Sequence, residues 1–372
     1  MKGTAIELRK LNRNRIYKLI HGSGQMAKQD IAIELSLSLP TVNQNLKELV
    51  SMGLIDYSGT FDSTGGRKAK AITLVAEAKY AIGLELTQTH IRLVAVDLCG
   101  TAYFYEKQHR MFSAQDEYGQ YLGNIVQSFV EKNQIPNDKI LGVGIAIPGT
   151  IDDNIDYIGM APSLKVKRFS RSMLTRYIPY SCIIDNDANA GGFAEMWNSY
   201  QENTLAYLSV EAGVGGSILM NNTLFKGHHQ RAGEFGHMII QPNGRKCNCG
   251  KNGCLEGYVS IARLSDDLGC QLEEFFVELD GGNEIYIKIW DSYLDYLCVG
   301  INNIRMALDC DVILGGVIVQ YLDPYVEEIQ NRLSELNTFE KNGNYFRLGK
   351  YHSMATAVGV ALQHVDKFIE TI

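Results

Sequence analysis

Apolar positions near the start of the chain recur at the period of a helix. Between about Ile6 and His21, the apolar residues Ile16, Leu19 and Ile20 fall on one face, and this spacing predicts an amphipathic helix. A second, shorter helix is predicted over Lys28 to Leu35. The chain therefore begins with two helices.

A third helix is predicted within "LSLSLPTVNQNLKELVSMGLI", residues 35–55. Ser38 suits the N-cap, and Pro40 lies in the first turn, where its missing N–H does no harm. Gly53 suits the position just past the helix end. Apolar residues at i, i+4, i+7 and i+8 predict one buried stripe, formed by Val42, Leu46, Leu49 and Val50.

The other faces of this third helix are polar and expose Thr41, Asn43, Gln44 and Lys47. Such side chains suit base edges and phosphates in the major groove of DNA. The following "LIDYSGTFDSTGGRKAKAITL" predicts two strands around a Gly65-Gly66 tip, with Arg67 and Lys68 beside it, like the wing of a winged helix-turn-helix. The alternative is a small helical interaction domain with a solvated basic face.

Strands alternate with helices from residue 80 onward. "AIGLELTQTHIRLVAVDLCG" predicts two strands around a turn, a helix follows at about 115–133, and "ILGVGIAIPGTID" and "CIIDNDANAGGFAEMW" each begin with a buried strand. "NTLAYLSVEAGVGGSILMNNTLFKG" predicts a hairpin, "DVILGGVIV" a core strand and "ATAVGVALQHVDKFI" a closing helix. This alternation predicts an α/β fold of mixed sheets with helices on both faces.

Charge divides the chain into the same two parts. Residues 1–76 hold 11 Lys and Arg against 6 Asp and Glu, a net charge of +5, and the remainder holds 24 against 36, a net charge of −12. A small basic module is thus joined to a large acidic body. A polyanionic partner is expected for the first part only, and the domain boundary is predicted at about residue 76.

No stretch of the 372 residues approaches the roughly 18 consecutive apolar residues of a membrane helix. The first twenty residues carry scattered charges and no long apolar run, which argues against a signal peptide. A cytoplasmic location is therefore expected, where the eight cysteines need not form disulfides.

Three cysteines and a histidine cluster within "GHMIIQPNGRKCNCGKNGCLEGY", residues 236–258. His237, Cys247, Cys249 and Cys254 follow the spacing H-x9-C-x-C-x4-C. Three thiolates and one imidazole form a closed tetrahedral set, which is typical of structural zinc. A reduced loop without a metal is the alternative. A redox pair is disfavoured because C-x-C followed by x4-C is not the thioredoxin-type C-x-x-C.

The segment "AGEFGHMIIQPNGRKCNCGKNGCLEGYVS", together with "GIAIPGTID" and "IDNDANAGGFAE", resembles the ROK family, named for repressors, open reading frames and kinases. The resemblance covers nearly the whole chain. It implies a two-lobed, actin-like and ribonuclease-H-like sugar-kinase fold over residues 77–372. The first lobe is expected over about 77–190 plus the C-terminal helix, and the second over about 191–350. An N-terminal winged helix, over residues 1–76, distinguishes the family's repressor branch.

In that family a zinc loop supports a sugar site between the lobes. Carried over by motif, the implied sugar-binding residues are Asn186, Asp187, Glu234, His237 and Glu256. The resemblance implies that His237 holds zinc through one ring nitrogen and faces the sugar with the other. Carboxylates accept hydrogen bonds from two hydroxyls at once, which suits a sugar. If Asp187 or Glu234 is considered alone, the alternative to a sugar-binding role is an acidic residue in an exposed loop.

In the family's kinases the counterpart of Asp187 is the general base, so an active kinase remains an alternative. The phosphate loops nevertheless depart from the family pattern. Residues 85–89 read ELTQT in place of D-x-G-G-T, residues 211–217 read EAGVGGS in place of G-T-G-x-G-G-G, and residues 314–317 have one glycine fewer than L-G-G-G. Lost glycines remove the close backbone approach to phosphates, and Glu211 adds a negative charge. The sugar site is therefore expected to persist and the ATP site to be lost, which leaves Asp187 a vestigial base.

The sequence thus predicts a sugar-responsive transcriptional regulator, with a repressor of a carbohydrate-utilisation operon favoured, carrying structural zinc and no kinase activity. Expected partners are operator DNA with an inverted repeat, a monosaccharide or sugar derivative, and further copies of the chain, as a homodimer or tetramer. One alternative is an active sugar kinase fused to a DNA-binding domain. The other is a ligand-independent regulator, because Ser163 replaces the family's usual asparagine and the aromatic that often follows is displaced to Phe169.

Overall fold

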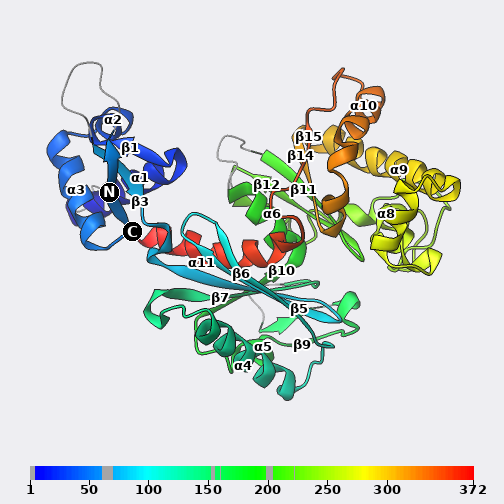
Figure 1. Cartoon of the computed structure of the whole chain (residues 1–372), viewed down its shortest axis with the longest axis horizontal. Coiled ribbons are helices and arrows are strands. Elements are labelled where there is room, and N and C mark those ends of the chain that lie inside the picture. Colours follow the sequence, from blue (N-terminus) through cyan, green and yellow to red (C-terminus); the bar gives the residue numbers. More distant parts are fainter. Residues whose placement is uncertain (1–4, 61–69, 152–155, 160, 198–203, 222) are drawn as a thin grey trace.

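The computed structural model describes residues 5–60, 70–151, 156–159, 161–197, 204–221 and 223–372. The N-terminal elements form a module at one end of the molecule, and the remainder contains two sheets with helices packed on and between them (Figure 1). The predicted order of a winged helix-turn-helix followed by a sugar-kinase-like α/β body is confirmed.

The N-terminal module packs three helices on a small antiparallel sheet of order β1-β3-β2. The helices are α1 (Ala5–Ser23), α2 (Lys28–Glu34) and α3 (Leu39–Ser51), and the strands are β1 (Gln25–Ala27), β2 (Ile55–Thr60) and β3 (Lys70–Leu74). Ile16 and Ile20 of α1 are fully buried against Leu46 of α3 and its neighbours. The predicted wing tip, with Arg67 and Lys68, lies outside the described residues.

The third helix begins and ends where its sequence predicts. Ser38 Oγ accepts a hydrogen bond from the Thr41 amide at 3.3 Å and caps the first turn. At the other end Gly53 adopts φ +69°, and the Leu54 amide donates to the Leu49 carbonyl at 3.0 Å. This 6→1 bond is that of a Schellman motif, which explains why glycine is needed there.

The buried stripe of α3 differs from the prediction at one position. Val42, Leu46 and Leu49 are fully buried, but Val50 is 39% exposed. Asn45 lies in the stripe instead, and its Nδ2 donates to the Thr41 carbonyl at 2.8 Å. The buried face is therefore centred on i, i+3, i+4 and i+7, and a polar residue is tolerated in it because its amide bonds to the helix's own backbone.

The first five-stranded sheet has the order β10-β7-β4-β5-β6. β4, β5 and β6 pair antiparallel, whereas β7 adds in parallel to β4 and β10 in parallel to β7. The strands are β4 (Tyr80–Leu86), β5 (His90–Asp97), β6 (Ala102–His109), β7 (Ile140–Ile147) and β10 (Cys182–Asn186). One face is covered by α4 (Asp116–Lys132), whose Leu122, Val126 and Phe129 are buried against the strands. Smaller elements beside it are β8 (Tyr157–Ile158), β9 (Phe169–Ser170) and α5 (Arg171–Thr175).

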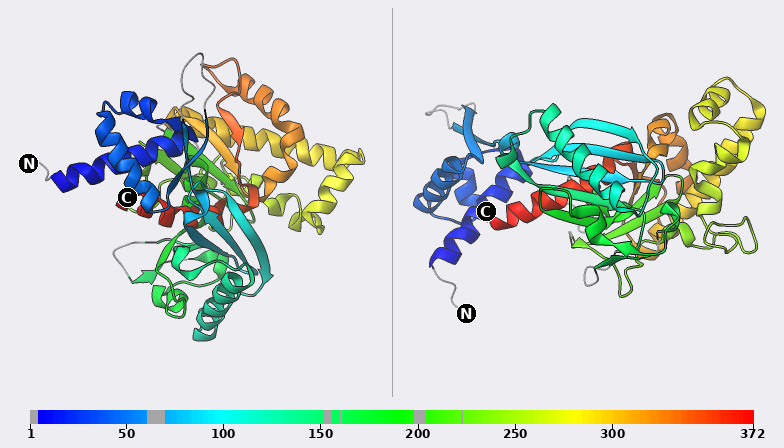
Figure 2. Two further views of the ribbon diagram at one scale, coloured as in Figure 1. Left: turned by 60° about the vertical axis from the view of Figure 1, so that its left-hand side comes forward. Right: turned by 90° about the horizontal axis from the view of Figure 1, so that it is seen from below.

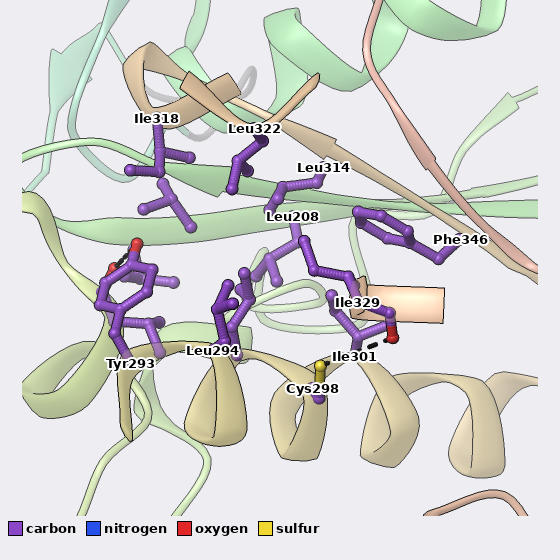
Figure 3. Close-up of a cluster of buried hydrophobic side chains, with 14 of the residues drawn as sticks. Leu208, Tyr293, Leu294, Cys298, Ile301, Leu314, Ile318, Leu322, Ile329 and Phe346 are labelled. Atoms are coloured by element: carbon purple, nitrogen blue, oxygen red, sulfur yellow. Dashed lines mark hydrogen bonds between the residues drawn. The ribbon is translucent and has the colours of Figure 1, made fainter. Parts of the chain in front are cut away.

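The second five-stranded sheet has the order β13-β12-β11-β14-β15, and the predicted hairpin is its β11–β12 pair. The strands are β11 (Thr204–Val210), β12 (Val214–Met220), β13 (Thr223–Leu224), β14 (Asp311–Gly315) and β15 (Phe346–Leu348). Its helices are α7 (Glu256–Val259), α8 (Leu272–Asp280), α9 (Glu284–Leu308) and α10 (Val326–Leu336). Leu208 and Leu314 of the sheet face Leu294 and Ile301 of α9 across an apolar core (Figure 3). In the described part of the chain, no helix has the length and apolar character needed to cross a membrane.

Two helices, α6 (Asp187–Trp197) and α11 (Ala355–Thr371), lie between the sheets (Figures 1 and 2). α11 rests on the first sheet, where a Cβ at Gly83 of β4 would stand 1.8 Å from Ala357 O. α6 rests on the second sheet and touches α11 backbone to backbone, since a Cβ at Gly359 would stand 1.7 Å from Ala190 O. Only glycine permits such approaches, so sheets and helices form one continuous stack.

Candidate functional site

The polar face of α3 is the candidate DNA-reading surface. Gln44 and Lys47 are exposed, and Thr41 and Asn43 are half-exposed. With its amide oxygen turned toward α1, Gln44 accepts from Arg9 Nη2 at 3.0 Å. That contact fixes the Gln44 side chain and leaves its amide N–H groups available to a partner.

The four predicted metal ligands come together in the loop before α7. The ligand atoms of His237, Cys247, Cys249 and Cys254 all lie within 4.8 Å of one another. Cys249 Sγ is 3.8 Å from Cys254 Sγ, and Cys247 Sγ is 3.7 Å from His237 Nδ1. Gly250 and Gly253, both at φ +85°, let the chain turn tightly around the cluster.

These separations fit a tetrahedral ion. Ligands about 2.3 Å from a central zinc stand about 3.8 Å from one another along each tetrahedral edge, close to the two distances found here. Zinc also prefers sulfur and imidazole-nitrogen donors such as these, whereas magnesium and calcium prefer oxygen donors. None of the eight cysteines forms a disulfide. The cluster therefore has both the geometry and the chemistry of a structural metal centre.

His237 has a different neighbour on each side. Its Nδ1 faces the Cys247 sulfur, while its Nε2 lies 3.9 Å from Glu234 Oε2. A metal bound at Nδ1 would fix the ring orientation, so that Nε2 points at the region beside Glu234. The side chain of Glu234 is 54% exposed and open to a ligand.

Glu256 lies behind the metal cluster. Its Oε1 is 3.2 Å from Cys247 Sγ, and its Oε2 accepts from the Val214 amide at 3.2 Å. The carboxylate is buried and connects the cysteine loop to the turn between β11 and β12. A sugar at Glu256 would have to share an oxygen with one of these contacts, so its sugar-binding role stays a prediction.

Asn186 and Asp187 stand at the junction of β10 and α6. Asn186 Oδ1 accepts from the Asn189 amide at 3.1 Å, and its Nδ2 donates to the Gly149 carbonyl at 3.2 Å. Burial, and to a smaller extent the charges of Glu85 and Glu234, raise the pKa of Asp187 to about 6. Asp187, at the start of α6, and Glu234, just before residues 235–237, are thus close enough for the charge of Glu234 to affect the pKa of Asp187.

The positions of the first phosphate loop carry a buried ion pair. Glu85 and Arg92 stand directly opposite each other in the β4–β5 hairpin, and Arg92 Nη1 is 2.6 Å from Glu85 Oε1. Burial alone would lower the pKa of Arg92, but the carboxylates of Glu85 and Glu211 hold it above its usual range. This pair fixes the hairpin with side chains, where a phosphate cradle would need free backbone N–H groups.

Glu211 takes a donor of its own chain. Its Oε1 accepts from the Val317 amide at 2.9 Å, just after Gly316, which adopts φ +90°. Burial and the charge of Glu85 raise the pKa of Glu211 to about 8, despite Arg92 and the Val317 N–H. The Glu211 carboxyl group therefore binds the backbone N–H that follows the glycine pair at the end of β14.

No sequence motif points to Arg92, whereas Phe169 stands out as a displaced aromatic. Arg92 could have been found from the hairpin, because a turn at residues 87–90 sets Arg92 opposite Glu85. Phe169 is buried against Phe112, with ring centroids 5.5 Å apart, and belongs to the core of the first sheet. Ser163 is exposed. Phe169 is therefore not available to stack on a sugar.

Comparison with known proteins agrees with this arrangement. The ROK family profile matches residues 81–365, and a winged helix-turn-helix DNA-binding profile matches residues 10–56. A xylose repressor from Bacillus spizizenii is 24% identical over 376 residues, covering 98% of this chain and 97% of that protein. An N-acetylglucosamine repressor from Escherichia coli is 25% identical over 260 residues, covering 69% and 64%.

Solved structures share the fold. A ROK family transcriptional regulator described as a homologue of the E. coli Mlc protein superposes with a TM-score of 0.77 at 20% identity, covering 98% of this chain and 97% of that one. A ROK family glucokinase from Streptomyces griseus, in complex with glucose and AMPPNP, superposes with a TM-score of 0.62 at 20% identity, covering 76% and 98%. From its profile match, cysteine cluster and two-sheet body, the chain belongs to the ROK family.

Proposed function

We propose that this protein is a sugar-responsive transcriptional repressor of a carbohydrate-utilisation operon, with one structural zinc per chain and no kinase activity. One observation carries the proposal. A DNA-binding module is joined to a sugar-kinase-like body whose phosphate-loop positions are occupied by the chain's own side chains, through the Glu85–Arg92 pair and the Glu211–Val317 contact. The repressor names of the two relatives support the same reading.

The sugar would bind between Asn186 and Asp187 on one side and Glu234, His237 and Glu256 on the other. These side chains supply carboxylate, amide and imidazole groups, which match the alternating donors and acceptors of sugar hydroxyls. Zinc at His237 and the three cysteines would hold the Glu234 and Glu256 segments in place, since metal-ligation energy is also folding energy.

DNA recognition would use two copies of the chain. One short recognition helix contacts few bases, so specific binding by a winged helix-turn-helix requires a dimer, or a pair of dimers, on an inverted repeat. Light scattering at micromolar concentration tests this, and a monomer with full operator affinity would contradict it.

Fluorescence anisotropy with a labelled operator tests the function as a whole. The operator is a duplex selected from random DNA by the protein, and it is titrated with and without millimolar D-xylose, N-acetylglucosamine and related monosaccharides. We expect at least one sugar to release the DNA. If none changes the affinity, a ligand-independent regulator replaces the sensor.

An active sugar kinase is the second candidate, because Asp187 has the position and the raised pKa of about 6 expected of a general base. We expect no ATP-dependent phosphorylation of the same sugars in a coupled assay. Turnover near the enzyme median of about 10 per second, abolished by Asp187→Asn, would establish the kinase instead.

A further inference from the structure

Helix α6 connects the candidate sugar site to the DNA-binding module. It begins at Asp187 and ends at Trp197, 11 residues later, a length of about 16 Å. At its far end the Trp197 indole meets the His21 ring of α1 edge to face, with centroids 5.5 Å apart. A single short helix thus contacts the proposed ligand with one end and the DNA-binding module with the other.

The His21 side of this contact is well defined. Its Nε2 lies 3.0 Å from the Leu98 carbonyl at the end of β5. Burial lowers the pKa of His21, so the ring is neutral at pH 7 and its Nε2–H donates to that carbonyl. His21 is therefore anchored to the first sheet while its ring rests on Trp197.

Helix α11 runs beside α6 and makes polar contacts both near the candidate sugar site and with α1. Near the sugar site, Gln363 Nε2 donates to Asp185 Oδ2 at 2.6 Å, and Thr356 Oγ1 donates to the Asp187 carbonyl at 3.3 Å. At the far end the last turn of α11 and the residue after it contact α1 through three polar pairs, which are Asn14 with Ile369 O, Lys18 with Glu370, and Arg13 Nε with Ile372 O.

The two helices are in direct backbone contact. At Gly359 and Ala190 no side chain separates them, and elements packed this closely transmit displacements to each other. Figure 1 shows α11 extending from the centre of the body to the N-terminal module.

From α1 the contacts continue to the recognition helix. Arg13 Nη1 is 2.9 Å from Glu48 Oε2 on α3, and Arg9 pairs with the other oxygen of the same carboxylate. Arg9 also holds Gln44, one of the predicted base-reading residues. The orientation of α3 is thus tied to α1, and that of α1 to the ends of α6 and α11.

We propose that α6 and α11 form a rigid two-helix strut that carries displacements at Asn186 and Asp187 to the DNA-binding module, with Trp197–His21 as its joint. The inference rests on the proposed function for the direction of the signal. The strut differs from a signal passed by movement of whole subunits, because every contact in its route lies within one chain. By reciprocity, DNA bound at α3 must in turn affect the first turn of α6.

Hydrogen exchange tests the strut without any sugar. The full-length protein is compared free and saturated with its selected operator duplex. In the wild type we expect DNA to slow amide exchange in residues 187–190 by about fivefold or more. In His21→Leu, and independently in Asn14→Ala, this slowing should be lost or strongly reduced. Arg15→Ala, on α1 but directed toward Leu35 of α2, is the matched control and should behave as the wild type.

A second readout uses operator affinity with and without the sugar found above. His21→Leu should bind operator within about threefold of the wild type in the absence of sugar, yet lose most of the 10- to 150-fold response. Unchanged exchange at residues 187–190 on DNA binding in the wild type, or an identical DNA effect in His21→Leu, would overturn the strut. A wild type that responds to no sugar but shows the exchange effect would overturn the proposed function and leave the strut standing.

Discussion

His237 has two functions in the proposed site, and each depends on a different ring nitrogen. Nδ1 belongs to the cysteine cluster and Nε2 faces Glu234. Because a metal ligand fixes its ring, the metal sets the direction in which Nε2 can donate or accept. Loss of the metal should therefore weaken sugar binding through His237, the metal ligand that is predicted to face the sugar.

Replacing Cys249 by serine should remove the metal. The Cys249 thiol is exposed, and a hydrogen bond from the Lys251 amide lowers its pKa. A lower pKa favours the thiolate form that zinc requires. Elemental analysis of protein purified without chelator should give one zinc per wild-type chain, little in Cys249→Ser and one in Cys270→Ser, whose sulfur lies outside the cluster. Metal-free wild-type protein would contradict the site.

Glu211 predicts a loss of stability as the pH rises from about 4.5 to about 8. The folded-state pKa of about 8 lies above the ordinary value of 4.5, so between these values the folded state binds more protons than the unfolded one. Stability that is fully present below about pH 4.5 is then lost progressively up to about pH 8, by at most about 1.4 kcal/mol per pH unit, and changes no further above it.

Thermal unfolding from pH 6 to 9 measures this loss. Glu211→Gln should flatten the slope, because it removes the titrating proton while keeping an oxygen for the Val317 N–H. Glu234→Gln, which changes an exposed carboxylate in the same region, should leave the wild-type slope unchanged. Parallel curves for the wild type and Glu211→Gln would show that Glu211 is ionised in the folded protein.

Helices and strands could be predicted from the sequence where short-range features such as caps, glycines and apolar runs mark them. Caps and glycines defined α3, and apolar runs followed by polar residues defined β10 and α6. No element was predicted between residues 259 and 310, yet α9 spans 25 residues there. Its sequence "EIYIKIWDSYLDYLCVGINNIRMAL" is rich in isoleucine and aromatic residues, which favour strands, and packing on the second sheet overrides that preference.

The site shows the same limit. The metal ligands are close in sequence and could be predicted from spacing, whereas Arg92, Val317 and the contacts of Glu256 depend on how distant segments meet. Asn45 also replaced Val50 in the buried face of α3 because a hydrogen bond within the helix, which hydrophobicity does not reveal, compensates its burial.

For the recognition helix, two substitutions should separate base reading from phosphate binding. Gln44→Ala should relax sequence preference, since a good base contact contributes about 1–3 kcal/mol of discrimination. Arg67→Ala, in the predicted wing, should weaken binding to all sequences alike and flatten its salt dependence. Anisotropy titrations with the operator and point-substituted duplexes at several salt concentrations distinguish the two. Equal losses across all duplexes for Gln44→Ala would remove it from the reading surface.

At the scale of the whole molecule, the sugar response requires two states that differ in the separation of Asp187 from the Glu234 segment. A sugar held by Asp187 from one side and Glu234 from the other should favour the state in which the two approach. A 10- to 150-fold loss of operator affinity corresponds to about 1.4–3 kcal/mol of coupling, and DNA must weaken sugar binding by the same factor.

Glu234→Gln should abolish that response and leave operator affinity without sugar near the wild-type value, because Glu234 lies beside His237 in the candidate sugar site and is not one of the residues that hold α3. The same titration with and without sugar measures both quantities. A variant that no longer binds DNA at all would show that Glu234 supports the fold, and the sensor reading would fail.

The junction of α1 with α11 also has a consequence for how the protein is made. The Lys18–Glu370 pair joins positions 352 residues apart. At about 5–20 residues per second, a ribosome needs roughly 18–70 s between the two. During that interval every nascent chain carries a winged helix whose sequence is complete but whose docking helix does not yet exist. A newly made molecule therefore passes through a period in which its DNA-binding module is not yet subject to its own sensor.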